Sequence, residues 1–328
     1  MFWSEAFHYE IPSDTIILEV GGIMEIYSSE NGKLNYVDGI EFKLEKDIQR
    51  LCENNLKKLF DLQVVTSEFI LQNLRIDTLA FDSKAKSFVV IEYKKDKNLS
   101  VIDQGFSYLS VVLNNKADCI LEYNENNKSP MKKDDIDWTQ TRVMFIAPAF
   151  TQFQIQSINF KDLPIELWEI RKYANDTVSF LQIQSSRVAE SIKTISSKNK
   201  TIEGVSKEIK VFTEDDHLSI ASDVIRELYE QLRVSLLGIG GQIKVKPNKM
   251  YIGFIAKTNF VDVHVQKKAL KLWLNLKIGE LNDPQHIARD MSSIGKWGNG
   301  DYELQISNDE NLDYVLGLAK QSYKKNSQ

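Results

Sequence analysis

Three strand-like segments follow one another between residues 63 and 94, and the turns that separate them are too short to hold a helix. They read QVVTSEFIL, RIDTLAFD and SFVVIEYK. Short connections join strands in antiparallel pairs. Apolar residues recur at helical spacing before them, over residues 40–60, and after them, over about residues 101–113. The order helix, three strands, helix and a further strand predicts a mixed sheet with helices packed on its faces.

Further strand-like segments extend the predicted sheet. DCILEY, at residues 118–123, reads as the next strand, and a polar loop follows it. RVMFIAP, IELWEIRKY and TVSFLQI then add three more strands. We therefore expect one α/β domain over residues 39–185, a mixed β-sheet flanked by helices. Residues 1–38 are expected to form a β lead-in, in which Asn31-Gly32 is a strong signal for a two-residue hairpin turn.

The second half of the chain predicts a separate α+β domain. Residues 186–216 are rich in Ser, Lys and Glu with weak periodicity, which is typical of a linker that is helical in part. A helix over residues 218–240 follows, then the strands MYIGFIAK, FVDVHVQ and ALKLWLNL, and a last helix over residues 311–325. We expect this domain to span residues 217–328. A chain of 328 residues, 42% of them hydrophobic, can fill two cores.

Charged residues interrupt two of the apolar strands. Glu92 and Lys94 project from one face of SFVVIEYK because side chains alternate along a strand. A turn at residues 82–87 would bring Asp77, on the preceding strand, to the same end of the sheet. Buried charges are rare unless they are paired or bind a metal. One interpretation is a buried ion pair that only neutralises itself, although such pairs return little net stability.

The other interpretation is a site for a divalent metal, Mg²⁺ or Mn²⁺. Asp77, Glu92 and the main-chain carbonyl of Tyr93 supply the hard oxygen ligands that such ions prefer. Lys94 would orient or deprotonate the attacking water and help to neutralise the charge that develops on the phosphate. The pattern therefore favours hydrolysis of a phosphate ester.

Two helices supply further candidates for this site. Gln104 and Tyr108 are four residues apart, so they share one helix face and are placed to reach a metal-bound water or a phosphate. In the first helix, Glu45 lies near the edge of the apolar stripe and is the better candidate for an extra metal ligand. Glu53 is expected to point away from the site.

Residues 41–146 resemble the PD-(D/E)xK nuclease superfamily, and they look closest to its NucS-like branch of mismatch and branched-DNA endonucleases. The match lies in LEKDIQ, RID, IEYK and QGFSY. The resemblance implies a restriction-endonuclease-like core that hydrolyses phosphodiester bonds with one or two Mg²⁺ ions. The positions that it makes catalytic are Asp77, Glu92, Lys94, Gln104 and Tyr108.

Two basic residues beside the motif, Arg75 in RID and Lys95 after IEYK, are expected to bind the substrate. The lead-in is too short for the separate DNA-binding domain that NucS proteins carry there, so mismatch specificity is not expected. The superfamily also includes inactive scaffolds. The alternative function is therefore a catalytically inactive, nuclease-like subunit that binds nucleic acid or supports an assembly.

Residues 219–325 resemble a module of unknown function at the C-terminus of nuclease-like and restriction-related bacterial proteins. FVDVHVQKKALKLWLNL and IGKWGNGDYEL carry this match. In ALKLWLNL the four leucines share one face, so Lys271 and Trp273 share the other. Trp273 is a candidate to stack on a base, and the alternative is that a neighbouring helix covers it. The domain is expected to recognise the substrate or to regulate.

Composition and charge limit the classes of protein and the location in the cell that the sequence allows. A net charge of −5 disfavours a protein that coats nucleic acid without specificity. No long apolar run and no signal-peptide pattern occurs, so a cytoplasmic protein with no membrane partner is expected. Cys52 and Cys119 are expected to be buried thiols. The leading hypothesis is a metal-dependent DNA endonuclease of DNA repair or of defence against foreign DNA, with a homodimer left open.

Overall fold

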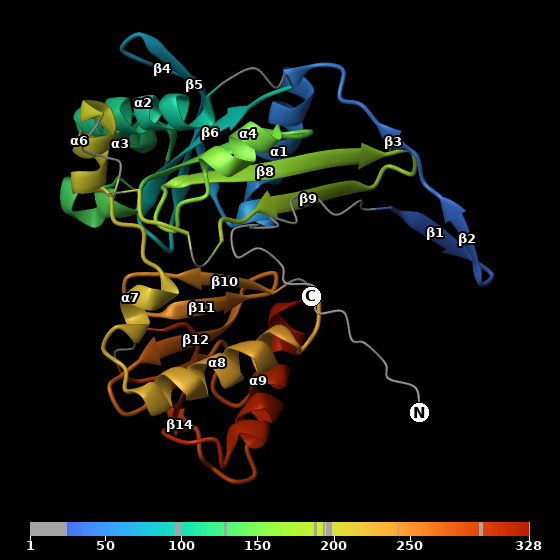
Figure 1. Cartoon of the computed structure of the whole chain (residues 1–328), viewed down its shortest axis with the longest axis vertical. Helices are drawn as coiled ribbons and strands as arrows, with labels where there is room; N and C mark the ends of the chain where they lie inside the picture. Colours follow the sequence, from blue (N-terminus) through green and yellow to red (C-terminus); the bar gives the residue numbers. More distant parts are fainter. Residues whose placement is uncertain are drawn as a thin grey trace, which may run out of the picture.

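The structure is a computed structural model that describes residues 25–95, 100–127, 130–186, 189–192, 194, 199–241, 243–294 and 298–327. Within these residues the chain builds two units, each around its own sheet and apolar core. In Figure 1 the N-terminal unit lies above the C-terminal unit. The first part of the predicted β lead-in, residues 1–24, lies outside the described residues.

A mixed sheet forms the centre of the N-terminal unit. Among the described residues it has seven strands, in the order β3-β8-β7-β6-β5-β4 with β9 paired to β8. The pairs β6–β7 and β7–β8 are parallel and the others antiparallel, which confirms the predicted mixed sheet. The strands are β3 (Gly39–Ile40), β4 (Gln63–Leu71), β5 (Leu74–Asp82), β6 (Ser87–Tyr93), β7 (Arg142–Ala147), β8 (Ile165–Tyr173) and β9 (Val178–Ile183).

Helices cover both faces of this sheet. Val89, Ile91 and Tyr93 of β6 pack with α1 on one face, whereas Val90 packs on the other face with the remaining helices. This confirms the alternation predicted for SFVVIEYK.

No helix in the described part of the chain is long and apolar enough to cross a membrane. The helices of the unit are α1 (Glu45–Phe60), α2 (Val101–Asn114), α3 (Lys116–Asn126), α4 (Gln152–Ser157) and α6 (Lys200–Glu208), with short 3₁₀ turns η1 (Lys133–Asp135) and η2 (Trp138–Gln140).

A two-stranded hairpin precedes this unit, formed by β1 (Tyr27–Glu30) and β2 (Lys33–Tyr36). Glu30 pairs with Lys33, so the turn between them has two residues. These are Asn31 and Gly32, with φ of 50° and 77°. Positive φ at both positions is what the tight hairpin turn requires, and the Asn-Gly prediction is confirmed.

The strand predicted at residues 118–123 is wrong, because these residues belong to α3. Cys119 and Tyr123 are four residues apart and both are buried against the sheet. A short apolar run fits a strand or one turn of a buried helix equally well, and here tertiary packing decides for the helix.

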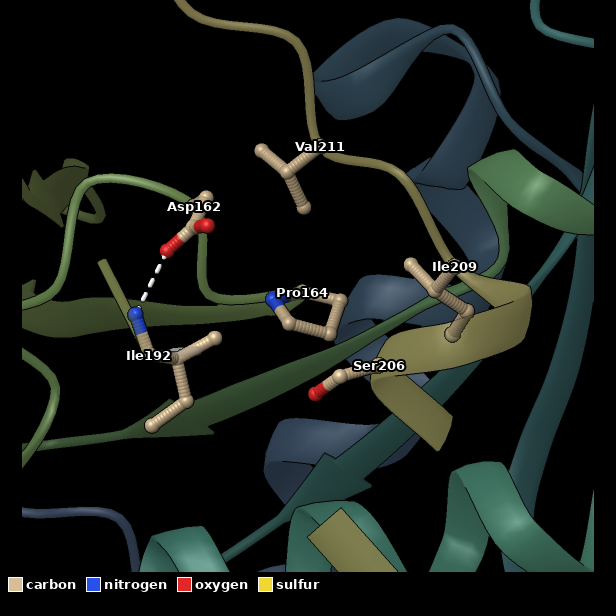
Figure 2. A pocket seen from close by; sticks show the side chains of 6 residues that line it. All are labelled: Asp162, Pro164, Ile192, Ser206, Ile209 and Val211. Carbon is tan, nitrogen blue, oxygen red and sulfur yellow. Dashed lines mark hydrogen bonds between the residues drawn. The ribbon is translucent and has the colours of Figure 1, made fainter. Parts of the chain in front are cut away.

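The linker predicted at residues 186–216 is also wrong. Ile192, Ile202, Val205 and Ile209 are buried in the core of the N-terminal unit. Figure 2 shows Ile192, Ile209 and Val211 gathered around Pro164, and the N–H of Ile192 donates to Asp162 at 2.7 Å. The polar composition of the segment conceals a small number of apolar residues that pack on the sheet.

An antiparallel sheet forms the C-terminal unit, with six strands among the described residues in the order β10-β11-β12-β13-β15-β14. Leu270, Leu272 and Leu274 of β13 face the core with α8 and α9, as their alternation predicts. The helix predicted over residues 218–240 is split, since Ser222 starts a second helix. The elements are α7 (Glu214–Leu218), α8 (Asp223–Leu237), β10 (Lys244–Pro247), β11 (Ile252–Ile255), β12 (Asn259–Val265), β13 (Leu270–Leu274), β14 (Arg289–Asp290), β15 (Tyr302–Ile306) and α9 (Leu312–Asn326).

Residues of β10 join the two units. Lys246 lies 3.7 Å from Asp82, at the end of β5. The Lys244 Nζ lies 4.2 Å from the ring centre of Trp168 in β8. Asp82 follows Asp77 on β5 by five residues, a span of about 16 Å along a strand. The C-terminal unit therefore contacts the end of the sheet that is remote from Asp77.

Candidate active site

Strands β5 and β6 separate at Asp77. Their ladder ends at the pair Thr78–Ile91. Beyond this pair the Asp77 carboxylate acts in place of a main-chain acceptor, since its Oδ2 accepts the N–H of Tyr93 at 3.0 Å. Asp77 is only 6% exposed. The antiparallel turn thus brings this carboxylate to the end of β6 that carries Glu92, as the sequence predicts.

Glu92 and Lys94 form a close pair at this end of β6. The Lys94 Nζ lies 2.5 Å from Glu92 Oε1, and the two side chains are 20% and 4% exposed. The main-chain N–H of Lys94 donates to the carbonyl oxygen of Ile146 at 3.0 Å, which holds the strand end on β7. An amine and a carboxylate are therefore fixed together beside Asp77.

Helix α2 lies across the same opening. Gly105 lets the helix approach β8 closely, because a Cβ at this position would lie 2.5 Å from Cδ1 of Ile165. Gln104 and Tyr108 of this helix reach the site. The Gln104 Nε2 lies 3.4 Å from Glu92 Oε1 and 3.4 Å from the hydroxyl of Tyr108. The Tyr108 hydroxyl donates to the carbonyl oxygen of Arg75 at 3.3 Å. Both predicted residues of α2 are at the site.

Burial and like charge perturb the acids of this site. Burial first, and then the charge of Glu92, raise the pKa of Asp77 from 3.8 to about 6, although the N–H of Tyr93 and the charge of Lys94 oppose the change. Burial and the neighbouring Glu92 also raise the pKa of Tyr108, so its hydroxyl keeps its proton. Two carboxylates that repel each other in a buried place are a common feature of functional sites.

A hydrogen-bond network from α1 supports Asp77 from behind, and sequence reasoning missed it. Gln49, which is buried, donates from Nε2 to the carbonyl oxygen of Asp77 at 2.9 Å and to Glu53 Oε1 at 3.0 Å. Glu53 Oε1 also accepts from the hydroxyl of Thr78 at 2.6 Å and from that of Ser67 at 2.7 Å.

The expectation that Glu53 points away is therefore wrong. The available signal was that Gln49 and Glu53 each follow a buried apolar residue of α1, Ile48 and Cys52, so both lie on its inner side.

The remaining predicted residues lie around the opening. Glu45 Oε2 accepts the N–H of Lys95 at 3.0 Å, and its charge is close enough to contribute to the raised pKa of Asp77. The Lys95 Nζ donates to the carbonyl oxygen of Lys43. Arg75 points outward, with its side chain 65% exposed.

The donor set fits a small divalent cation. Glu92 Oε2 and Gln104 Oε1 are buried and accept no well-formed hydrogen bond within the described residues. In the same residues no group of three or more Asp, Glu, His or Cys side chains could hold a metal, so Glu45 does not complete a cage. Asp77, Glu92 and the carbonyl of Tyr93 remain as the ligands, and Mg²⁺ commonly takes one or two carboxylates and keeps several waters.

Trp273, predicted to bind substrate, is not available for stacking. It is 3% exposed, and a Cβ at Gly298 would lie 2.7 Å from its indole ring. Gly298, a loop residue, lies against the indole, so the ring is not exposed. The prediction of an exposed Trp273 is wrong.

Comparisons with known proteins match different parts of the chain. Residues 214–326 match the model of a domain of unknown function, DUF5655, which confirms the expected module at the C-terminus. The structure of Pyrococcus furiosus SfsA in complex with Ca²⁺ is similar at 12% identity and a TM-score of 0.25, over 51% of this chain and 79% of that chain.

An uncharacterized protein of Haemophilus influenzae matches almost the whole chain. The two are 47% identical over 301 residues, which is 92% of this chain and 100% of that protein. The chain belongs to the family of this uncharacterized Haemophilus influenzae protein.

Proposed function

We propose that the protein is a metal-dependent endonuclease that hydrolyses phosphodiester bonds of DNA. One observation carries the proposal: Asp77, Glu92 and Lys94 converge where β5 and β6 separate, and one buried oxygen of Glu92 is left without a well-formed hydrogen bond. A purely structural ion pair has no need of a second buried carboxylate beside it. A phosphate-cleaving centre needs both.

Mg²⁺ or Mn²⁺, when bound by Asp77, Glu92 and the carbonyl of Tyr93, would act as a Lewis acid and lower the pKa of water. The chain sets up the surroundings for this ion. The pairing of β5 with β6 places the two carboxylates close together despite their repulsion, and the N–H of Tyr93 and the Gln49 amide hold the Asp77 segment in place.

Lys94 and the residues of α2 have separate roles in the proposal. The Lys94 ammonium is held by Glu92 and lies at the strand end, where it donates to the oxygen that gains charge at phosphorus. Gln104 and Tyr108 present an amide and a protonated hydroxyl on the same side as Glu92. These groups orient water or a phosphate oxygen and do not exchange protons at neutral pH.

DNA is the proposed substrate because of the resemblance of residues 41–146 to DNA endonucleases and because basic side chains lie around the acidic opening. Lys95 and Arg75 are both exposed there. Phosphate neutralisation by such residues supplies most of the affinity for a nucleic-acid backbone. The C-terminal unit contacts the other end of the sheet, so the proposal gives it no contact with the scissile bond.

The experiment is a cleavage assay on the full chain with linear, nicked, single-stranded and branched DNA. Mg²⁺ or Mn²⁺ is added, and EDTA is the control. We expect metal-dependent cleavage that is lost in Glu92→Gln and Asp77→Asn and kept in Asp134→Asn, which changes an exposed carboxylate of the same unit. Full activity in either site variant would refute the proposal. DNA binding without cleavage of any substrate would select the alternative, an inactive nuclease-like subunit.

A further inference from the structure

A carboxylate outside the site holds two cations beside it. Glu68 Oε1 lies 2.6 Å from the Lys46 Nζ of α1, and Glu68 Oε2 lies 3.1 Å from the Arg75 Nε of β5. The side chains of Lys46 and Arg75 are 52% and 65% exposed, and that of Glu68 is 34% exposed. One anion therefore bridges two solvent-facing cations that come from different elements.

The position of Glu68 ties this cluster to the candidate active site. The β4–β5 register pairs Ser67 with Thr78 and Phe69 with Ile76, so Glu68 lies across from Asp77. Glu68 has a φ of 55°, in the left-handed region that is uncommon for a residue other than glycine. Figure 1 shows the β4–β5 hairpin at the end of the sheet away from the C-terminal unit. The cluster thus faces solvent at the end of the sheet where the acidic opening lies.

A DNA backbone that enters this opening meets an unfavourable charge. Asp77, Glu92 and Glu45 surround it, and Lys94 is already paired with Glu92. The phosphates on either side of the scissile bond therefore need cations outside the opening. Lys46 and Arg75 are held together by one carboxylate, which is the arrangement that one phosphate group would need.

We propose that Lys46 and Arg75 form a binding subsite for a backbone phosphate of DNA, and that Glu68 occupies this subsite until a phosphate displaces it. The inference rests on the proposed function, since it names how the same site receives its substrate. Both ion pairs are exposed, and exposed pairs shift an equilibrium by at most about fivefold each. Glu68 can therefore hold the two side chains in place and still yield to a phosphate that carries a full charge.

The test is equilibrium binding of a fluorescein-labelled 20-base-pair DNA duplex to the full chain in EDTA, followed by anisotropy at several salt concentrations. Lys46→Gln and Arg75→Gln should each weaken binding several-fold and lower the salt slope, and the double variant should lower it by about 0.9, the value for one phosphate contact. Glu68→Gln should tighten binding by about fivefold, because the competing charge is gone while the side-chain shape remains. Lys58→Gln, an exposed lysine at the far end of α1, is the matched control and should leave both quantities unchanged.

The outcomes separate the two proposals. If the unchanged protein neither binds nor cleaves DNA, the proposed function fails and the subsite fails with it. If it binds DNA, but Glu68→Gln does not tighten binding or Lys46→Gln and Arg75→Gln behave as Lys58→Gln does, only the subsite is overturned. Arg75→Lys keeps the charge and should retain most of the affinity. Thermal melting of each variant establishes that the fold is kept, and a variant that melts early is replaced by the corresponding Ala variant.

Discussion

Asp77→Asn should make the metal-free protein more stable at neutral pH while it removes the proposed activity. The pKa of Asp77 rises from 3.8 in the unfolded chain to about 6 in the fold, chiefly through burial and the charge of Glu92. A difference of about two pKa units corresponds to about 3 kcal/mol of folding free energy at pH 7. The Asn side chain keeps the size and an oxygen that can accept the N–H of Tyr93. We expect a gain of about 1–3 kcal/mol, or several degrees in Tm.

The pH dependence of the free energy of unfolding has a definite sign. A group whose folded pKa lies above its unfolded value binds more protons in the fold, so its contribution to stability falls as pH rises from about 4 to about 6. The advantage of Asp77→Asn over the unchanged protein should therefore be near zero at pH 4 and full at pH 7 to 8. Because other carboxylates titrate over the same range, the quantity to follow is the difference between the two proteins at each pH, measured by thermal or urea unfolding.

A divalent ion should reverse the order of stability of the unchanged protein and Asp77→Asn. Mg²⁺ or Mn²⁺ stabilises the form that binds it, so the unchanged protein should gain Tm with metal concentration and Asp77→Asn should gain little. Asp134→Asn, at an exposed position, should follow the unchanged protein in every condition. An Asp77→Asn protein that is less stable than the unchanged protein at pH 8 without metal would refute the argument that buried charge repulsion is present. An equal response of both proteins to metal would refute the assignment of Asp77 as a ligand.

Four further predictions address separate parts of the structure. Lys94→Gln should lower the cleavage rate by orders of magnitude and leave Mn²⁺ affinity unchanged in a titration, and a matching loss of metal affinity would contradict its assigned role. Gln49→Leu removes the bonds to Asp77 and Glu53, so it should cost about 1–3 kcal/mol in urea unfolding and weaken Mn²⁺ binding. Trp273→Ala should cost about 3–5 kcal/mol in unfolding of the C-terminal unit without a change in DNA affinity, and weaker DNA binding by the folded variant would restore the stacking role. A fragment of residues 25–212 should melt cooperatively, whereas one that ends at residue 190 should not, since it lacks Ile202 and the rest of α6.

Alternation and turn signals determined much of the fold before any tertiary contact was known. The faces of β6 and β13 follow from their sequences alone, because neighbouring side chains on a strand must point in opposite directions. Asn31-Gly32 fixed its hairpin because few residues other than these adopt positive φ easily. The convergence of Asp77, Glu92 and Lys94 also follows from the sequence, since a short turn leaves an antiparallel pair as the natural arrangement.

Only the tertiary structure decided features that depend on what packs against a segment. Residues 118–123 are a short segment and residues 186–216 are mostly polar. Contact with the sheet, rather than their own pattern, makes residues 118–123 helical and buries Ile192, Ile202, Val205 and Ile209. The role of Glu53 depends on the crossing of α1 over β5, and the burial of Trp273 depends on the approach of Gly298 from a distant loop. The bridge from Lys46 through Glu68 to Arg75 joins residues as far as 29 positions apart. Pairings of this kind depend on how helices and loops pack on a sheet. A periodic pattern in the sequence carries no information about which distant residues come into contact.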